Sequence, residues 1–146
     1  MQGGILVPVD DSSEARRAVE QAAGLAARLN GGVTLMTVVA TSMLPRQALE
    51  PAQLARLEGH FRETGERVLA GLRPVVEAAR VPVETKRVEG VPADEIIAEA
   101  GRGYLFVVMG GRGAGLTGRD RALLGSVSDR VLRQSPVPVL IVRGDN

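Results

Sequence analysis

The sequence predicts a single α/β domain in which five parallel strands form an open twisted sheet with helices on both faces. The chain has 146 residues, a length typical of one domain. Five short apolar runs alternate with segments that have helical periodicity. The runs are almost continuously apolar, as strands buried on both faces of a parallel sheet are. We therefore expect residues 1–146 to form one domain without internal repeats.

The predicted strands are the apolar runs themselves, taken in chain order. They are Ile5–Val9, Val33–Val39, Val81–Val88, Tyr104–Met109 and Val137–Val142.

The first predicted helix has small and apolar residues at every third or fourth position, which places them on one stripe. Asp11 or Ser12 is expected to cap it, and Asn30-Gly31-Gly32 to end it. The other helices are expected at about Pro51–Ala79, at Ala93–Gly101 and from near Gly125 to about Gln134. The segment Ala40–Glu50 is the only long irregular connection and could act as a mobile cover.

Composition excludes several classes of function. Eighteen basic and seventeen acidic side chains leave a net charge of +1, so there is no general attraction to nucleic acid or anionic membranes. The absence of cysteine excludes disulfides, thiolate metal sites and cysteine catalysis. No apolar run is long enough to span a bilayer, and the N-terminus has no basic region. We expect a cytoplasmic protein without nucleic-acid or membrane partners.

Two stretches follow predicted strands at the edge where such sheets bind ligands, outside the carboxyl ends of the strands. Pro8-Val9-Asp10 follows the first strand, and Met109–Gly113 follows the fourth. The carboxylate of Asp10 can accept a hydrogen bond from a ribose hydroxyl. Its alternative role is that of a turn or capping residue beside Asp11.

The second stretch opens a glycine-rich loop that leads to the last predicted helix. Glycines in such a loop let backbone N–H groups approach a ligand closely. Gly125-Ser126 begins the helix, and a helix N-terminus favours phosphate. The alternative is a flexible loop before a helix that Ser126 caps. In that case the loop arginines (Arg112, Arg119 and Arg121) are solvated charges instead of phosphate contacts.

Other nucleotide and catalytic motifs are not supported. Gly113–Gly118 has the form GxGxxG, but it follows the fourth strand instead of the first. A Walker A loop would need Lys after its last glycine, where this chain has Arg119. His60 has no second histidine or spaced carboxylates to form a metal site. No nucleophile with its base is recognisable.

Three segments resemble the universal stress protein family. They are ILVPVD at residues 5–10, VVMGGRG at 107–113 and GSVSDRVLRQSPVPVLIV at 125–142. The resemblance covers essentially the whole chain. It implies a sheet of strand order 3-2-1-4-5, a cytoplasmic homodimer and, in one branch of the family, bound ATP.

The ATP-binding branch has the motif G-x2-G-x9-G-S/T, which this chain matches with a difference in spacing. Gly110, Gly113 and Gly125-Ser126 fit, but eleven residues separate Gly113 from Gly125. Starting from Gly115 keeps nine residues but puts Arg112 where the first glycine should be. Either Gly113 or Gly115 is thus the candidate phosphate contact.

Carried over by motif position, the resemblance assigns roles to individual residues. Asp10 would hold the ribose, and the backbone of Val38 would meet the adenine edge. The start of the last helix would bind phosphates, with Ser128 the weaker candidate, and Mg²⁺ or Mn²⁺ would bind through the phosphates. The complete candidate site is Pro8, Val9, Asp10, Val38, Met109, Gly110, Arg112, Gly113, Gly115, Gly125, Ser126, Val127 and Ser128.

The function expected from these features is that of an ATP-binding dimeric module that regulates or protects under stress. The first alternative is a weak ATP hydrolase, for which no base is evident, although a bound divalent ion and Asp120 could assist. The second alternative is a dimeric interaction protein that binds no nucleotide.

The last predicted strand is the expected dimer edge, because Val137–Val142 carries no charge and an apolar edge needs a cover. The third strand, at the opposite edge, is interrupted by Glu84, Lys86 and Arg87. If the nitrogen of Pro138 faces away from the fourth strand, Val139 and Ile141 bond to that strand. Leu140 and Val142 then offer their backbone groups to the partner.

Overall fold

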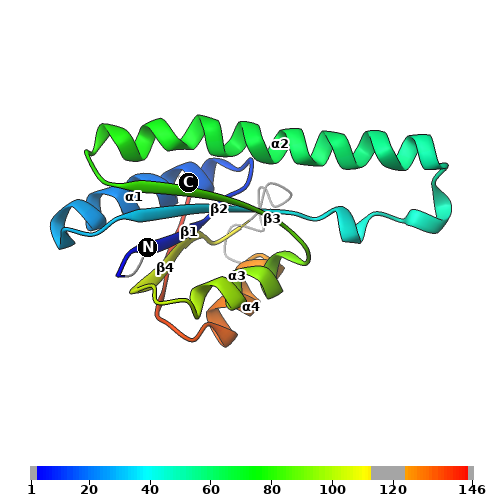
Figure 1. Ribbon diagram of the computed structural model, residues 1–146. Helices are drawn as coiled ribbons and strands as arrows, with labels where there is room; N and C mark the ends of the chain where they lie inside the picture. The colour runs from blue at the N-terminus through cyan, green and yellow to red at the C-terminus, as the bar shows by residue number, and fades with distance from the viewer. Residues whose placement is uncertain (1–2, 113–123, 145–146) are drawn as a thin grey trace.

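The computed structural model describes residues 3–112 and 124–144 and contains one parallel sheet with the order β3-β2-β1-β4-β5 (Figure 1). The predicted fold class and strand order are confirmed; β2 has the predicted bounds, and the ends of the other strands differ from the prediction by at most two residues. The elements are β1 Ile5–Pro8, α1 Ser13–Leu29, β2 Val33–Val39, 3₁₀ turns at Thr41–Met43 and Arg46–Ala48, α2 Pro51–Ala78, β3 Val83–Glu89, α3 Pro92–Ala100, β4 Phe106–Gly110, α4 Ser126–Gln134 and β5 Val139–Val142.

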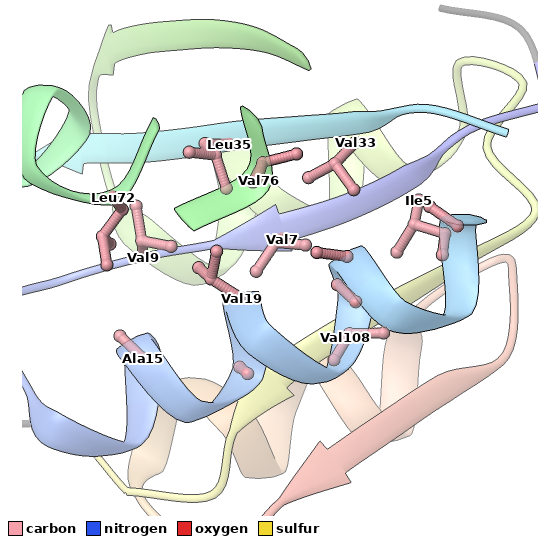
Figure 2. Packing of buried hydrophobic residues seen from close by; sticks show 14 of the residues in the cluster. Ile5, Val7, Val9, Ala15, Val19, Val33, Leu35, Leu72, Val76 and Val108 are labelled. Atoms are coloured by element: carbon pink, nitrogen blue, oxygen red, sulfur yellow. The ribbon is translucent and has the colours of Figure 1, made fainter. Parts of the chain in front are cut away.

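The sheet lies between two helical layers, with α1 and α2 on one face and α3 and α4 on the other (Figure 1). Side chains alternate between the layers along β1: Ile5 and Val7 pack against α1 and α2, whereas Leu6 packs on the other face. Figure 2 shows Val19 of α1 and Val76 of α2 in the first of these cores. Burial on both faces explains why the central strands are almost entirely apolar.

The ends of α1 follow from local sequence. The hydroxyl of Ser12 accepts a hydrogen bond from the backbone N–H of Ala15 (3.1 Å), which makes Ser12 the N-cap instead of Asp11. Asn30 adopts the left-handed conformation (φ 54°) and ends the helix as expected. The alternative in which Ser126 caps the last helix is wrong, because Gly125 is the N-cap and no side chain of the described residues caps α4.

Only part of α2 packs on the sheet, although the helix has 28 residues. Its buried residues begin at Gly65, and Figure 1 shows the N-terminal part of the helix extending past the sheet. Within residues 3–112 and 124–144, no helix combines the length and apolar character needed to cross a bilayer.

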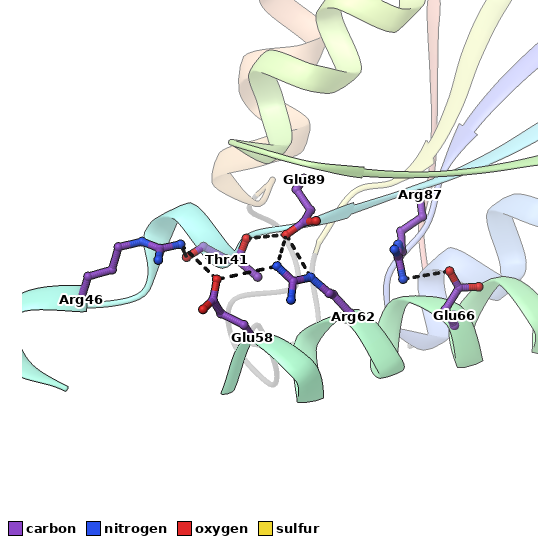
Figure 3. Close-up of polar contacts among 7 residues, drawn as sticks. All are labelled: Thr41, Arg46, Glu58, Arg62, Glu66, Arg87 and Glu89. Carbon is purple, nitrogen blue, oxygen red and sulfur yellow. Dashed lines mark hydrogen bonds and ion pairs between the residues drawn. The ribbon is translucent and has the colours of Figure 1, made fainter. Parts of the chain in front are cut away.

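The connection between β2 and α2 contains two 3₁₀ turns and is tied to its neighbours by polar contacts (Figure 3). Thr41 donates a hydrogen bond to Glu89 at the end of β3 (2.9 Å). Arg62 of α2 pairs with the same carboxylate (3.0 Å), and Arg46 pairs with Glu58 of α2 (3.4 Å). The segment that looks irregular in sequence is therefore anchored to both α2 and β3.

The predicted hydrogen-bond phase of β5 is wrong. The carbonyl of Pro138 accepts from the N–H of Val107 (2.9 Å), and that of Val142 accepts from Gly111 (3.1 Å). The backbone groups of successive residues point to alternate sides of a strand. Those of Leu140 therefore also point toward β4, whereas those of Val139 and Ile141 point away from the sheet. Proline is tolerated because it precedes the first residue of β5, so its missing N–H falls before the ladder begins.

Candidate functional site

A pocket of about 580 Å³ opens at the carboxyl edge of the sheet, between the ends of β1, β2 and β4 and the N-termini of α1, α3 and α4. Its volume lies within the range of about 300–1,000 Å³ common for small-molecule sites. Its wall brings together eleven of the thirteen sequence-predicted residues, and the other two, Gly113 and Gly115, lie outside the described residues. The eleven are Pro8, Val9, Asp10, Val38, Met109, Gly110, Arg112, Gly125, Ser126, Val127 and Ser128.

Asp10 stands at the mouth of the pocket, where β1 has ended. Its Oδ1 accepts a hydrogen bond from the N–H of Ser12 (3.0 Å), which orders the turn into α1. No hydrogen bond to Oδ2 occurs among the described residues, and the side chain is exposed. Asp10 thus serves the turn with one oxygen, while the other has no hydrogen-bond partner among the described residues.

One wall of the pocket is apolar. It is formed by Met36 and Val38 of β2 together with Pro92 and Ile96 of α3. The carbonyl of Met36 accepts from Val9 N–H (2.8 Å). Val38 is two residues further along β2, so its backbone N–H and carbonyl point to the same side as those of Met36. At this level β1 has already ended. Met36, Pro92 and Ile96 had no sequence signal beyond hydrophobicity, because only the packing of α3 on the sheet brings them here.

The N-terminus of α4 forms another part of the lining. The N–H of Gly125 donates to the carbonyl of Gly111 (2.7 Å), so it is already used and does not fit the expected phosphate contact. The N–H groups of Ser126 and Val127 lie in the first helical turn, where they have no acceptor within the helix. They line the pocket together with the exposed hydroxyl of Ser126.

Ser128 has a different role from the weak phosphate contact that the sequence suggested. Its hydroxyl is buried and lies 2.6 Å from the carbonyl of Gly111, to which it donates, and 3.1 Å from that of Gly125. A hydroxyl has one proton to donate. Ser128 therefore joins α4 to the end of β4, and its hydroxyl has no proton left to donate to a phosphate.

Arg112 is not a solvated charge. Its side chain is 13% exposed, and its Nε and Nη2 donate to Oε1 of Glu14 at 3.1 and 3.0 Å. Its Nη1 is buried and has no hydrogen-bond partner within the described part of the chain. Of the guanidinium nitrogens, only Nη1 is not engaged by Glu14.

Glu14 does not line the pocket but holds the lining residue Arg112, and it was not among the residues predicted from the sequence. It is 5% exposed, and its carboxylate also accepts from the backbone N–H groups of Arg112 (2.7 Å) and Gly144 (2.9 Å). Burial raises the pKa of Glu14, but these hydrogen bonds and the Arg112 charge outweigh it and lower the pKa from its usual value. The only sequence signal was an acidic residue in the first turn of α1.

The requirement for glycine at position 110 also comes from Glu14. A Cβ on Gly110 would lie 2.9 Å from Glu14 Cβ and 3.3 Å from its backbone carbon. Gly110 is not among the described glycines with positive φ, which are Gly3, Gly90 and Gly103. Crowding against α1, not backbone conformation, thus accounts for this glycine.

Together these features suit a ligand with an apolar ring and an anionic end. The apolar wall from β2 and α3 can pack against the ring, and the free N–H groups at the start of α4 can donate hydrogen bonds to the anionic end. No cluster of three or more His, Asp or Glu side chains that could hold a metal ion occurs within residues 3–112 and 124–144.

Comparison with known proteins gives a consistent result. The sequence pattern of the universal stress protein family matches residues 1–143. A universal stress protein of Methanocaldococcus jannaschii is 33% identical over 95% of this chain and 81% of its own length. The structure of universal stress protein UspA from Lactobacillus plantarum superposes with a TM-score of 0.84 at 26% identity, and 97% of each chain is covered.

The similar structures include one with a bound cyclic nucleotide. It is a universal stress protein in complex with cAMP, 26% identical to this chain, with a TM-score of 0.68 and 97% of each chain covered.

Proposed function

The chain belongs to the universal stress protein family, and from that premise we propose that its pocket binds an adenine nucleotide, specifically ATP, as the ligand of a dimeric module in the stress response. The observation that carries the proposal is the convergence of eleven motif-derived residues on one pocket that has an apolar wall and a helix N-terminus. The similar structure in complex with cAMP supports an adenine nucleotide as the ligand.

Each part of the pocket has a counterpart in ATP. We assign the adenine to the apolar wall, with its edge at the backbone of Val38, and the ribose to Asp10, near Met109 and Gly110. The phosphates are assigned to Ser126 and Val127, together with Gly113 or Gly115. Mg²⁺ or Mn²⁺ would be held by the phosphates and would neutralise part of their charge.

Replacing Ser126 with alanine tests the phosphate assignment. A hydrogen bond to a charged group contributes about 1.5–3 kcal/mol, so Ser126→Ala should weaken ATP binding by roughly one to two decades. Adenosine has no phosphates, and its affinity should be nearly unchanged. Isothermal calorimetry with Mg²⁺ present measures both ligands. Ser42→Ala, an exposed serine outside the pocket, is the matched control. Wild-type protein that binds no ATP at millimolar concentration contradicts the proposal.

We also propose that the protein dimerises through β5. This strand is at the sheet edge, and the outward backbone groups of Val139 and Ile141 suit pairing with a second copy. Leu132 of α4 and Leu140 of β5 are 45% and 44% exposed. The opposite edge strand, β3, instead carries charges that pair locally, including Arg87 with Glu66 of α2 (3.0 Å).

Sedimentation velocity tests the dimer directly. At tens of micromolar the wild-type chain should sediment as a dimer, whereas sedimentation as a monomer alone contradicts pairing through β5.

A further inference from the structure

Glu14 joins three segments that are far apart in sequence. It lies in the first turn of α1, and its carboxylate accepts hydrogen bonds from Arg112 after β4 and from Gly144 after β5, at 2.7 and 2.9 Å. A Cβ on Gly144 would lie 2.9 Å from both Cγ and Oε1 of Glu14. The carboxylate is therefore enclosed by backbone, and its position is fixed.

The contacts continue from Glu14 to the N-terminus of α4. Holding the N–H of Arg112 fixes the peptide plane that this N–H shares with the carbonyl of Gly111. That carbonyl accepts hydrogen bonds from the N–H of Gly125 (2.7 Å) and the hydroxyl of Ser128 (2.6 Å). The same peptide unit thus connects Glu14 directly with the first turn of α4.

We propose that Glu14 is a positioning residue for the phosphate end of the pocket: by fixing the Gly111–Arg112 peptide, it sets where the free N–H groups of α4 point. This inference rests on the proposed binding of ATP. It assigns Arg112 to Glu14 as its counter-charge. It also separates Glu14 from the adenine end, because none of the residues that it bonds belongs to the apolar wall.

Glu14→Gln tests the role while changing little in shape. Glutamine has one acceptor oxygen, and its NH₂ group would face N–H donors. The Arg112 guanidinium also loses its counter-charge. ATP affinity should fall about tenfold or more, and adenosine affinity should stay within about twofold. Glu20→Gln is the control: Glu20 lies on the same helix, its side chain is 52% exposed, and it pairs only with Arg16 in the described contacts.

A second variant, with its own control, perturbs the Glu14 carboxylate from a position outside the pocket. Gly144→Ala places a Cβ against Glu14 and should displace it, again weakening ATP more than adenosine. Gly144 neither lines the pocket nor lies in a helix or strand, so the fold should persist. Gly24→Ala is the control, because a Cβ on Gly24 of α1 would meet nothing within 4 Å.

The outcomes separate this role from the proposed function. If the wild type binds no ATP, both the proposed function and the role of Glu14 are contradicted. Suppose instead that the wild type binds ATP. Then the role of Glu14 alone is contradicted if folded Glu14→Gln binds ATP equally well, or if it loses adenosine affinity to the same extent as ATP affinity. Should Glu14→Gln fail to fold, the same criteria apply to Gly144→Ala. Selective loss of ATP affinity, with both control variants unchanged, supports the role.

Discussion

Glu99 on α3 is a second buried carboxylate, on the opposite face of the sheet from Glu14. It is 6% exposed and accepts hydrogen bonds from Tyr104 (2.6 Å) and Lys86 (2.9 Å). Burial raises the pKa of Glu99, but the bonds from Lys86 and Tyr104 outweigh it and lower the pKa below the usual value. The charged form of Glu99 therefore stabilises the fold.

Replacing Glu99 with glutamine should make stability less sensitive to acid. Because the pKa of Glu99 is lowered in the folded state, its contribution is present above the unfolded pKa of about 4.3 and disappears as pH falls through the lowered value. Glu99→Gln should cost about 1.5–3 kcal/mol at pH 7, and the cost should shrink in acid. Urea unfolding of both proteins measures this. A cost that is the same at every pH contradicts it.

Tyr104 is the only tyrosine of the chain, so its ionisation can be followed by ultraviolet absorbance. Burial, followed by the hydrogen bond to Glu99, raises its pKa to about 12 from 10.0. Since this pKa is raised, the stability that Tyr104 contributes is complete below about pH 10 and is lost as pH rises toward 12. In Glu99→Gln the pKa of Tyr104 should fall but stay above 10.0, because the burial remains. A midpoint near 10 in the wild type contradicts this environment.

Local sequence position was enough to place some residues at the pocket. Asp10 and Ser126 were found because each follows a strand or starts a helix at the carboxyl edge of the sheet. Glu14 was missed because its partners, Arg112 and Gly144, are about a hundred or more positions away. Gly125 was assigned a phosphate contact because its bond to Gly111 is not visible in sequence.

At the scale of elements, two of the three glycines in α2, Gly65 and Gly71, have contrasting surroundings. A Cβ on buried Gly65 would lie 3.2 Å from Val39 and 3.3 Å from Thr37 of β2, whereas exposed Gly71 has nothing within 4 Å. Close packing on the sheet explains why position 65 holds glycine, whereas the contacts give no reason for glycine at position 71.

These glycines give a matched pair of substitutions. Gly71→Ala should stabilise the protein by about 0.5–1 kcal/mol, because alanine favours the helix. Gly65→Ala should stabilise the protein by less than this amount or destabilise it, because the side chains of β2 must shift. Thermal unfolding followed by circular dichroism compares them. If Gly65→Ala stabilises as much as Gly71→Ala, the close packing of α2 on β2 is contradicted.

The corrected phase of β5 reverses which backbone group serves the proposed dimer. N-methylation of Ile141 by semisynthesis should weaken dimerisation, because its N–H faces outward, and it should leave the monomer folded. N-methylation of Leu140 should damage the bonds to β4 instead. Sedimentation together with circular dichroism separates these effects. Intact dimers of the Ile141-methylated protein contradict pairing along this edge.

The strands were predictable because the apolar runs are dense, but their hydrogen-bond phase was not. The prediction assumed that Pro138 faces away from β4, but its carbonyl bonds to β4 and its nitrogen is tolerated because Pro138 precedes β5. The order of elements and their burial follow from periodicity, which survives such small shifts.

At the scale of the whole molecule, the order β3-β2-β1-β4-β5 brings the ends of β1 and β4 together at the centre of the sheet. The connections after these strands lead to helices on opposite faces, α1 and α4. This divergence creates the space that the pocket occupies, as in other open α/β sheets. The position of the pocket is thus a consequence of topology, and its chemistry comes from the residues after β1 and β4.

The central claim is that this pocket binds ATP with its phosphates at the start of α4. The most direct test is titration of ¹⁵N-labelled protein with ATP and Mg²⁺, followed by the backbone amide signals. We expect saturable shifts that are largest at Ser126 and Val127, with further shifts at Val38 and Asp10. Adenosine should reproduce only the shifts at Val38 and Asp10. Unchanged spectra at millimolar ATP, or shifts confined to residues outside the pocket, would contradict the claim.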